Sequence, residues 1–190
     1  MRPGHLIALT ILLLSACKED SAALPPPVAI SAEAVGFYCQ MDLLTHEGPK
    51  GQIHLAGLPA PIFFSQVRDT LAYLHMPEQS HAVEVAYVQD MANAQSWAKP
   101  GAWIAADTAI YVAGSDQMGG MGAPEFVPFS DATAAAAFIA VHGGALLRFD
   151  QIRPQDVLAP ETAKPEATDQ SDIATRLRAL APADRTDRTD

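Results

Sequence analysis

The chain has 190 residues and a formal net charge of −10. The negative charge is spread along the chain, which argues against nucleic-acid binding and against adsorption to anionic lipid. The length that follows residue 17 is enough for one compact domain and short for two.

Residues 1–16 are typical of a signal peptide. Arg2 supplies the positive start, and the apolar run at 6–14 is about nine residues long, too short for a spanning helix of about 20. Residues 14–17 read Leu-Ser-Ala-Cys, which resembles the bacterial lipobox, where cleavage precedes a cysteine that is then lipidated. We predict that Cys17 is a lipid anchor. The alternative is an ordinary signal peptide that ends beside a cysteine.

The anchor and the segment after it indicate the compartment. Residues 17–34 contain three consecutive prolines and are expected to form an extended tether. An aspartate directly after the lipidated cysteine is associated with retention in the inner membrane. This chain has Lys18 at that position, which favours the outer membrane. We therefore expect a periplasmic protein that is attached to a membrane through Cys17.

The first half of the predicted domain alternates short strands with one helix. Ser65 is a suitable N-cap for a helix over 66–75, which has apolar residues at helical spacing and is ended by Pro77. Alternation and apolar composition predict strands over 35–41, 52–55 and 82–88.

The second half has a similar pattern. Ser130 is an expected N-cap for an alanine-rich helix over 131–142, which ends at the glycine pair 143–144. Strands are predicted over 103–106, 109–113 and 145–152, and a loop rich in glycine and methionine over 115–124.

Both helices follow a short strand and precede another. We therefore predict an α+β fold with two tandem β-β-α-β units, about 35–90 and 102–153, packed as one small domain over residues 35–158. Residues 159–190 are polar and rich in proline and alanine, which is typical of a disordered tail.

Cys39 and Met41 form the main candidate site. If Cys17 is lipidated, Cys39 is the one free thiol, and on a strand its side chain would leave the same face as that of Met41. A thiolate with a thioether favours Cu(I), whereas structural zinc usually takes four nitrogen or sulfur ligands. The alternative is a buried inert thiol beside a core methionine.

A third ligand is sought among residues without a core pattern. Met118 and Met121 lie among glycines in the loop, where no periodicity assigns them to the core, and His46 lies beside a turn. The alternative for the methionines is that one or both simply pack on the domain. The alternative for His46 is that it is solvated, as a lone loop histidine usually is. His75 and His142 fall in the last turns of their helices, where a cation complements the helix dipole, so we interpret both as structural.

The sequence resembles the NosL family of lipoproteins, which are accessory to bacterial nitrous oxide reductase. The resemblance covers roughly residues 37–152 and depends on Cys39-Gln40-Met41, on Gly-Pro-Lys-Gly-Gln-Ile at 48–53, on the helix at 64–74, on Met121-Gly122 before Val-Pro-Phe at 127–129, and on His-Gly-Gly at 142–144. It implies a tandem β-β-α-β fold related to treble-clef folds.

The resemblance also implies a function. It implies a Cu(I)-binding metallochaperone, not an enzyme, that serves the copper–sulfide centre of nitrous oxide reductase together with an ABC-type maturation complex. The implied ligands are Cys39, Met41 and Met121, with His46 and Met118 as further candidates. Transfer would proceed by ligand exchange, because neutral thioethers stabilise Cu(I) without holding it too tightly for release.

Two other functional classes remain open from the residues. The first is an enzyme that uses Cys39 as nucleophile or redox thiol with His46 as base, although no acidic residue at a telling spacing would orient that base. The second is a lipoprotein adaptor without metal, which would be indifferent to copper and to substitution of Cys39.

Overall fold

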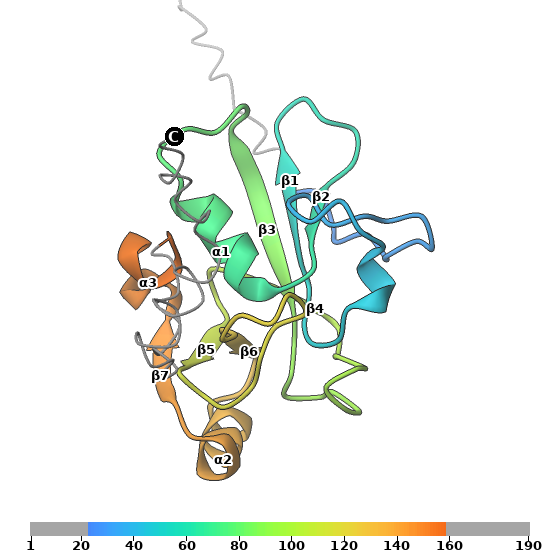
Figure 1. Cartoon of the computed structure of the whole chain (residues 1–190). Coiled ribbons are helices and arrows are strands. Elements are labelled where there is room, and N and C mark those ends of the chain that lie inside the picture. Colours follow the sequence, from blue (N-terminus) through green and yellow to red (C-terminus); the bar gives the residue numbers. More distant parts are fainter. Residues whose placement is uncertain (1–22, 159–190) are drawn as a thin grey trace, which may run out of the picture.

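The computed structural model describes residues 23–158, which form two antiparallel sheets with helices packed on them (Figure 1). The strand order is β2-β1-β3-β4 in the first sheet and β6-β5-β7 in the second. The predicted signal peptide, the Cys17 anchor and the predicted tail at 159–190 lie outside the described residues. Within residues 23–158, no helix combines the length and the apolar character needed to cross a bilayer.

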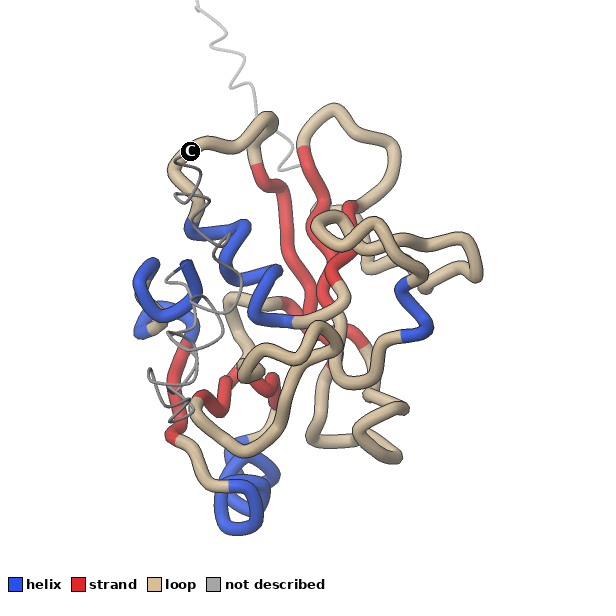
Figure 2. Tube along the Cα trace, viewed as in Figure 1, coloured by secondary structure: helices blue, strands red, loops and turns tan. Residues whose placement is uncertain are grey.

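The elements are short, and long connections join them. Figure 2 shows these connections in tan, among them residues 90–102 between β3 and β4 and residues 114–126 between β5 and β6. The strands are β1 (Gly51–Leu55), β2 (Ile62–Phe64), β3 (Val83–Gln89), β4 (Trp103–Ala105), β5 (Ile110–Ala113), β6 (Val127–Phe129) and β7 (Ala145–Arg148). The helices are η1 (Leu43–Thr45), α1 (Val67–His75), α2 (Ala132–His142), η2 (Phe149–Gln151) and α3 (Pro154–Leu158).

The fold confirms the predicted tandem arrangement. Elements β1-β2-α1-β3 and β5-β6-α2-β7 follow the same order, and in each sheet the first strand of the repeat lies at the centre. The strands themselves differ in part, since β2 and β6 lie outside the predicted strand ranges and β4 belongs to the other sheet. The strand at β4 was expected in the second repeat, but it pairs with β3, with Ile104 opposite Val88, and so extends the first sheet.

The ends of the helices correct two predictions. Neither Ser65 nor Ser130 is an N-cap; Gln66 and Asp131 hold those positions. The Asp131 side chain accepts a hydrogen bond from the Ala134 amide at 2.8 Å, the usual N-cap contact. At the other end of α2, Gly143 has a φ of 70°, as expected of a glycine that ends a helix.

Two predicted strands are also wrong in whole or in part. Residues 35–41 form isolated bridges and a turn instead of a strand. The last predicted strand, 145–152, ends at Arg148, where the chain enters η2. There the Arg148 amide donates to the side chain of Gln151 at 2.8 Å, and this bond closes the short helix.

The main core joins the two repeats. Leu71 of α1 packs in one cluster with Tyr111 of β5, and Tyr111 donates its buried hydroxyl hydrogen to the Ala106 carbonyl at 2.6 Å. Other members of this cluster are Ile53, Phe64, Val88, Phe126 and Ile152. A smaller cluster under α2 consists of Val112, Val127, Phe129 and Ala135. Because the larger cluster draws on both repeats, they fold as one domain.

Asp90 is a second link between the repeats. It follows β3, is buried, and accepts hydrogen bonds from the Ser130 amide at 2.9 Å and the Ser130 hydroxyl at 2.6 Å, just before α2. Ala92 and Asn93 donate two more. Burial opposes ionisation of Asp90, but these hydrogen bonds outweigh it and lower its pKa. The link is therefore present near neutral pH and is lost as the pH falls through that lowered pKa.

Candidate metal centre

Cys39 lies in a tight turn, not on a strand. The Gly36 amide donates to the Met41 carbonyl at 3.0 Å, the Gln40 amide donates to the Gly36 carbonyl at 2.8 Å, and Gln40 has a φ of 55°. The argument that a strand aligns Cys39 with Met41 is therefore wrong. Met41 closes the turn through its carbonyl, and it is 45% exposed.

The Cys39 sulfur points to the segment that joins β2 to α1. It is half-buried and lies 3.7 Å from the Ser65 hydroxyl oxygen. A side chain at Gly36 would collide with this sulfur, so glycine is needed there. Once Cys39 loses its proton, the Ser65 hydroxyl is placed to donate a hydrogen bond to the thiolate.

The loop that carries Met118 and Met121 is folded back on itself. Met118 pairs with Pro124 in a bridge, and the Gly119 amide donates to the Ala123 carbonyl at 2.7 Å. Both methionine side chains are exposed, at 52% for Met118 and 43% for Met121. This exposure favours the ligand interpretation over the alternative that either methionine packs on the domain.

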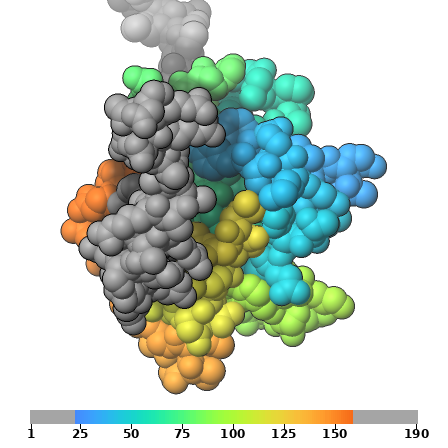
Figure 3. Space-filling model, viewed as in Figure 1, coloured from blue at the N-terminus to red at the C-terminus, as the bar shows by residue number. Residues whose placement is uncertain are grey.

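The methionine loop lies against the segment that contacts Cys39. The Met121 amide donates to the Gln66 side-chain oxygen at 3.1 Å, and a Cβ on Gly120 would collide with the Ser65 carbonyl and with His46. Figure 3 shows the loop, in yellow, meeting the cyan segment of the first repeat at the surface. Residues from both repeats thus meet around Ser65 and Gln66.

His46 belongs to the same cluster. Its Nδ1 lies 2.9 Å from the Gly120 carbonyl oxygen, which can only accept, so Nδ1 carries the proton. Its Nε2 is buried and has no hydrogen-bond partner among the described residues. A ring whose Nδ1–H is held by a carbonyl while Nε2 keeps a free lone pair is the usual arrangement of a metal-binding histidine.

The other histidines considered lie elsewhere. His75 stacks on Phe149 with ring centroids 6.3 Å apart. His142 pairs with Asp116 at 2.8 Å and packs on Phe138. These contacts agree with the structural roles expected of both.

Sequence reasoning missed the residues that hold the cluster together. Glu125 is fully buried, and its carboxylate accepts hydrogen bonds from the amides of Val67 at 3.0 Å, Arg68 at 2.8 Å and Phe126 at 2.9 Å. It thereby joins the end of the methionine loop to the start of α1. Burial raises the pKa of Glu125 to about 7, against the effect of these hydrogen bonds. In the sequence, the one sign of this role is that the charged Glu125 stands close to the apolar strand at 127–129.

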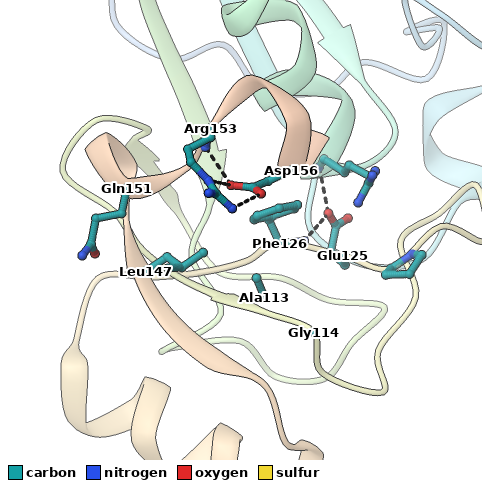
Figure 4. A pocket seen from close by; sticks show the side chains of 10 residues that line it. Ala113, Gly114, Glu125, Phe126, Leu147, Gln151, Arg153 and Asp156 are labelled. Carbon is teal, nitrogen blue, oxygen red and sulfur yellow. Dashed lines mark hydrogen bonds and ion pairs between the residues drawn. The ribbon is translucent and has the colours of Figure 1, made fainter. Parts of the chain in front are cut away.

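A cavity of about 590 Å³ lies behind Glu125 (Figure 4). Phe126 lines it with the Arg68 guanidinium 5.9 Å from its ring centre, and Arg153 forms a two-bond ion pair with Asp156 on one side of it. Neither Cys39 nor any methionine lines this cavity. The candidate ligands therefore lie outside this cavity.

The donor set of the cluster suits a soft cation. Within residues 23–158, no group of three or more His, Cys, Asp or Glu side chains is arranged to hold a metal, so a carboxylate-rich site for Ca²⁺ or Mg²⁺ is absent there. The cluster offers one thiol, thioethers and one imidazole, which are ligands that Cu(I) accepts.

Comparison with known proteins agrees with this chemistry. The family model described as NosL matches residues 27–157. The chain belongs to the NosL family. It is 52% identical over 179 residues to the copper-binding lipoprotein NosL of Achromobacter cycloclastes, which covers 92% of this chain and 93% of that protein. It is 32% identical over 155 residues to the protein of the same description from Stutzerimonas stutzeri, over 78% and 79% of the two chains.

A solved structure supports the same assignment. The crystal structure of the copper chaperone NosL from Shewanella denitrificans matches with a TM-score of 0.63 and 37% identity. The match covers 68% of this chain and 98% of that one. The α+β fold with two antiparallel sheets is therefore that of the family.

The buried carboxyl of Glu125 gives a prediction for stability against pH. Because its pKa is raised to about 7, the folded state binds more protons than the unfolded state between about pH 4.5 and 7. The contribution of Glu125 to stability is then full below about pH 4.5 and is lost as the pH rises through 7. We expect the advantage of the wild type over Glu125→Gln, measured by urea unfolding, to shrink across this range.

The control for this experiment is Glu78→Gln, since Glu78 is exposed. Its difference from the wild type should stay constant with pH. A constant difference for Glu125→Gln as well would show that Glu125 is ionised alike in the folded and unfolded chains.

Proposed function

We propose that this protein is a periplasmic Cu(I) chaperone, lipid-anchored through Cys17, which carries copper for the maturation of nitrous oxide reductase. The observation that carries the proposal is a set of neighbouring contacts: the Cys39 sulfur contacts Ser65, the Met121 amide binds Gln66, and His46 binds the carbonyl of Gly120, which lies against Ser65. The family supports it, since relatives are described as copper-binding lipoproteins or as a copper chaperone.

The thiolate of Cys39 is the anchor of the proposed site. It is the one anionic sulfur in the cluster, and the Ser65 hydroxyl is placed to stabilise it. Met41 and Met121 supply neutral thioethers, and the free Nε2 of His46 is available as a further ligand. Met118, in the same loop as Met121, is a further candidate ligand. Cu(I) needs few ligands, so the ion can shift among them.

Release follows from the exposure of the thioethers. Met41 and Met121 are each more than two-fifths exposed, whereas Cys39 is half-buried. An acceptor with its own soft ligands can therefore replace a thioether first and the thiolate last. The chemistry is ligand exchange without a covalent change. The contact of Cys39 is a serine hydroxyl rather than a base or a cation, which fits a ligand better than a nucleophile.

The partners are proposed from the resemblance to the NosL family. We propose that the ion passes to nitrous oxide reductase with the help of its ABC-type maturation complex. Lys18 after the anchor favours attachment to the outer membrane. The domain as a whole is proposed to extend over residues 35–158, with residues 159–190 as a tail.

Copper binding is tested by anaerobic titration of the chain from residue 18 on with Cu(I), in competition with a chromophoric chelator. We expect one tight equivalent. Cys39→Ser should lose it because the anionic ligand is gone, Met121→Ala should weaken it, and Ser65→Ala should weaken it about tenfold, as loss of a contact to a ligand usually does.

The matched control is Met91→Leu, because Met91 packs against the smaller core cluster under α2, away from the site. It should bind copper as the wild type does. Unchanged affinity in Cys39→Ser would remove the proposed site.

His46 is tested in the same titration. We expect His46→Gln to weaken Cu(I) binding, because glutamine offers no imidazole nitrogen as a ligand. The control is His81→Gln, which changes an exposed histidine and should bind copper as the wild type does. Equal affinity for the wild type and His46→Gln would exclude imidazole from the site.

Delivery is tested in a denitrifying cell that makes Cys39→Ser in place of the wild type. We expect nitrous oxide reductase to accumulate without its copper–sulfide centre, as seen in its visible spectrum and copper content. The Met91→Leu variant should restore the centre. A complete centre with Cys39→Ser would contradict the delivery role while leaving copper binding in place.

A further inference from the structure

The N-terminal segment, predicted as a tether, is bound to the first sheet. We call residues 23–30 the strap. The Val28 amide donates to the Gln52 side-chain oxygen at 2.8 Å, and the Gln52 amide group donates back to the Val28 carbonyl at 2.9 Å. The Tyr87 hydroxyl donates to the Pro25 carbonyl at 2.8 Å. Because Gln52 and Tyr87 are paired across β1 and β3, the strap crosses these strands.

The strap and α1 lie on opposite faces of this sheet. Side chains alternate along a strand, so Gln52 and Gly51 point to opposite faces. A Cβ on Gly51 would collide with Thr70 of α1, whereas Gln52 binds the strap. The Cys39 turn is bonded to the edge strand β2, and Cys39 and Met121 contact Ser65 and Gln66 directly before α1, so the candidate ligands lie at the β2 edge on the side of α1 and not under the strap.

The strap presents an uncharged apolar surface. Its bonds to the sheet use its backbone carbonyls and one amide, which leaves side chains to face outward, with Leu24 62% and Val28 42% exposed. No charged residue occurs from Ser21 to Ala32, although the whole chain carries a net charge of −10. A surface with apolar side chains and no charged group can lie against lipid without the cost of desolvating a charge.

The position of the anchor favours the lipid surface as the contact of the strap. Cys17 precedes Leu24 by seven residues, which span at most about 25 Å in any conformation. Because the strap is bound to the domain from Pro25 on, only residues 17–24 connect the lipid anchor to the folded domain. A free tether of 17–34 would instead have allowed every face of the domain to reach the bilayer.

We propose that the strap-covered face of the first sheet faces the lipid surface, so that the candidate ligands are presented on the side away from it. This inference rests on the proposed lipidation of Cys17. The partner is the bilayer surface itself, met by the exposed side chains of the strap. A protein held in this way offers its copper to acceptors in the periplasm and not to the membrane.

The test uses the full lipidated chain in vesicles of phosphatidylethanolamine and phosphatidylglycerol. On a Cys39→Ser background, the fluorophore bimane is attached at Val28→Cys, at Ala29→Cys or, as the control, at Thr133→Cys on the exposed surface of α2. Lipids brominated along their chains quench the fluorophore at short range. We expect quenching several-fold stronger at both strap positions than at α2.

The outcomes separate the two proposals. Lipidated protein that sediments with the vesicles but shows equal quenching at all three positions, or stronger quenching at α2, would overturn the membrane-facing strap alone. Protein that carries no lipid and does not sediment with vesicles would overturn the Cys17 anchor and this inference with it. A Tyr87→Phe variant, which loses one strap bond, should reduce the difference between strap and α2 without detaching the protein.

Discussion

The buried carboxylate of Glu125 is the interaction on which the site depends. It accepts amide hydrogen bonds at the start of α1 and at the end of the methionine loop, so it fixes both segments at one point. Beside it, Gln66 accepts from Met121, while Ser65 contacts Cys39. A carboxylate at a helix N-terminus is favoured by the helix dipole, which offsets part of the cost of its burial. The candidate ligands are therefore positioned by a contact that includes none of them.

The two repeats are held together by reciprocal acidic contacts. Glu125 of the second repeat binds the start of α1, and Asp90, which follows the first repeat, binds Ser130 before α2. Both carboxylates are buried, yet their pKa values shift in opposite directions. Glu125 is fully enclosed and burial prevails, whereas hydrogen bonds outweigh burial at Asp90. The two repeats are thus joined by polar contacts as well as by the shared core, and the candidate site lies where they meet.

The sequence predicted what is local. Periodicity located both helices and most strands, and the glycine pair at 143–144 located the end of α2. Ligand chemistry selected Cys39 and Met121 before any geometry was known. The turn at Cys39 was missed because Gln40 adopts a positive φ, which few residues other than glycine do. Contacts such as Met121 with Gln66, Glu125 with Val67, and His46 with Gly120 join residues more than fifty positions apart, and such pairs leave no periodic signal in a single sequence.

The structure reconciles a firm hold on the ligands with easy access to them. The backbones of Cys39 and Met121 are fixed by hydrogen bonds, so the ligands are ready without large rearrangement, and affinity is not lost to ordering the loop. The thioether ends remain exposed, so an approaching acceptor meets them before it meets the thiolate. A site closed by buried thiolates would bind more tightly but would release only after local unfolding. Rigid backbone with exposed soft side chains is therefore the combination that the proposed ligand exchange requires.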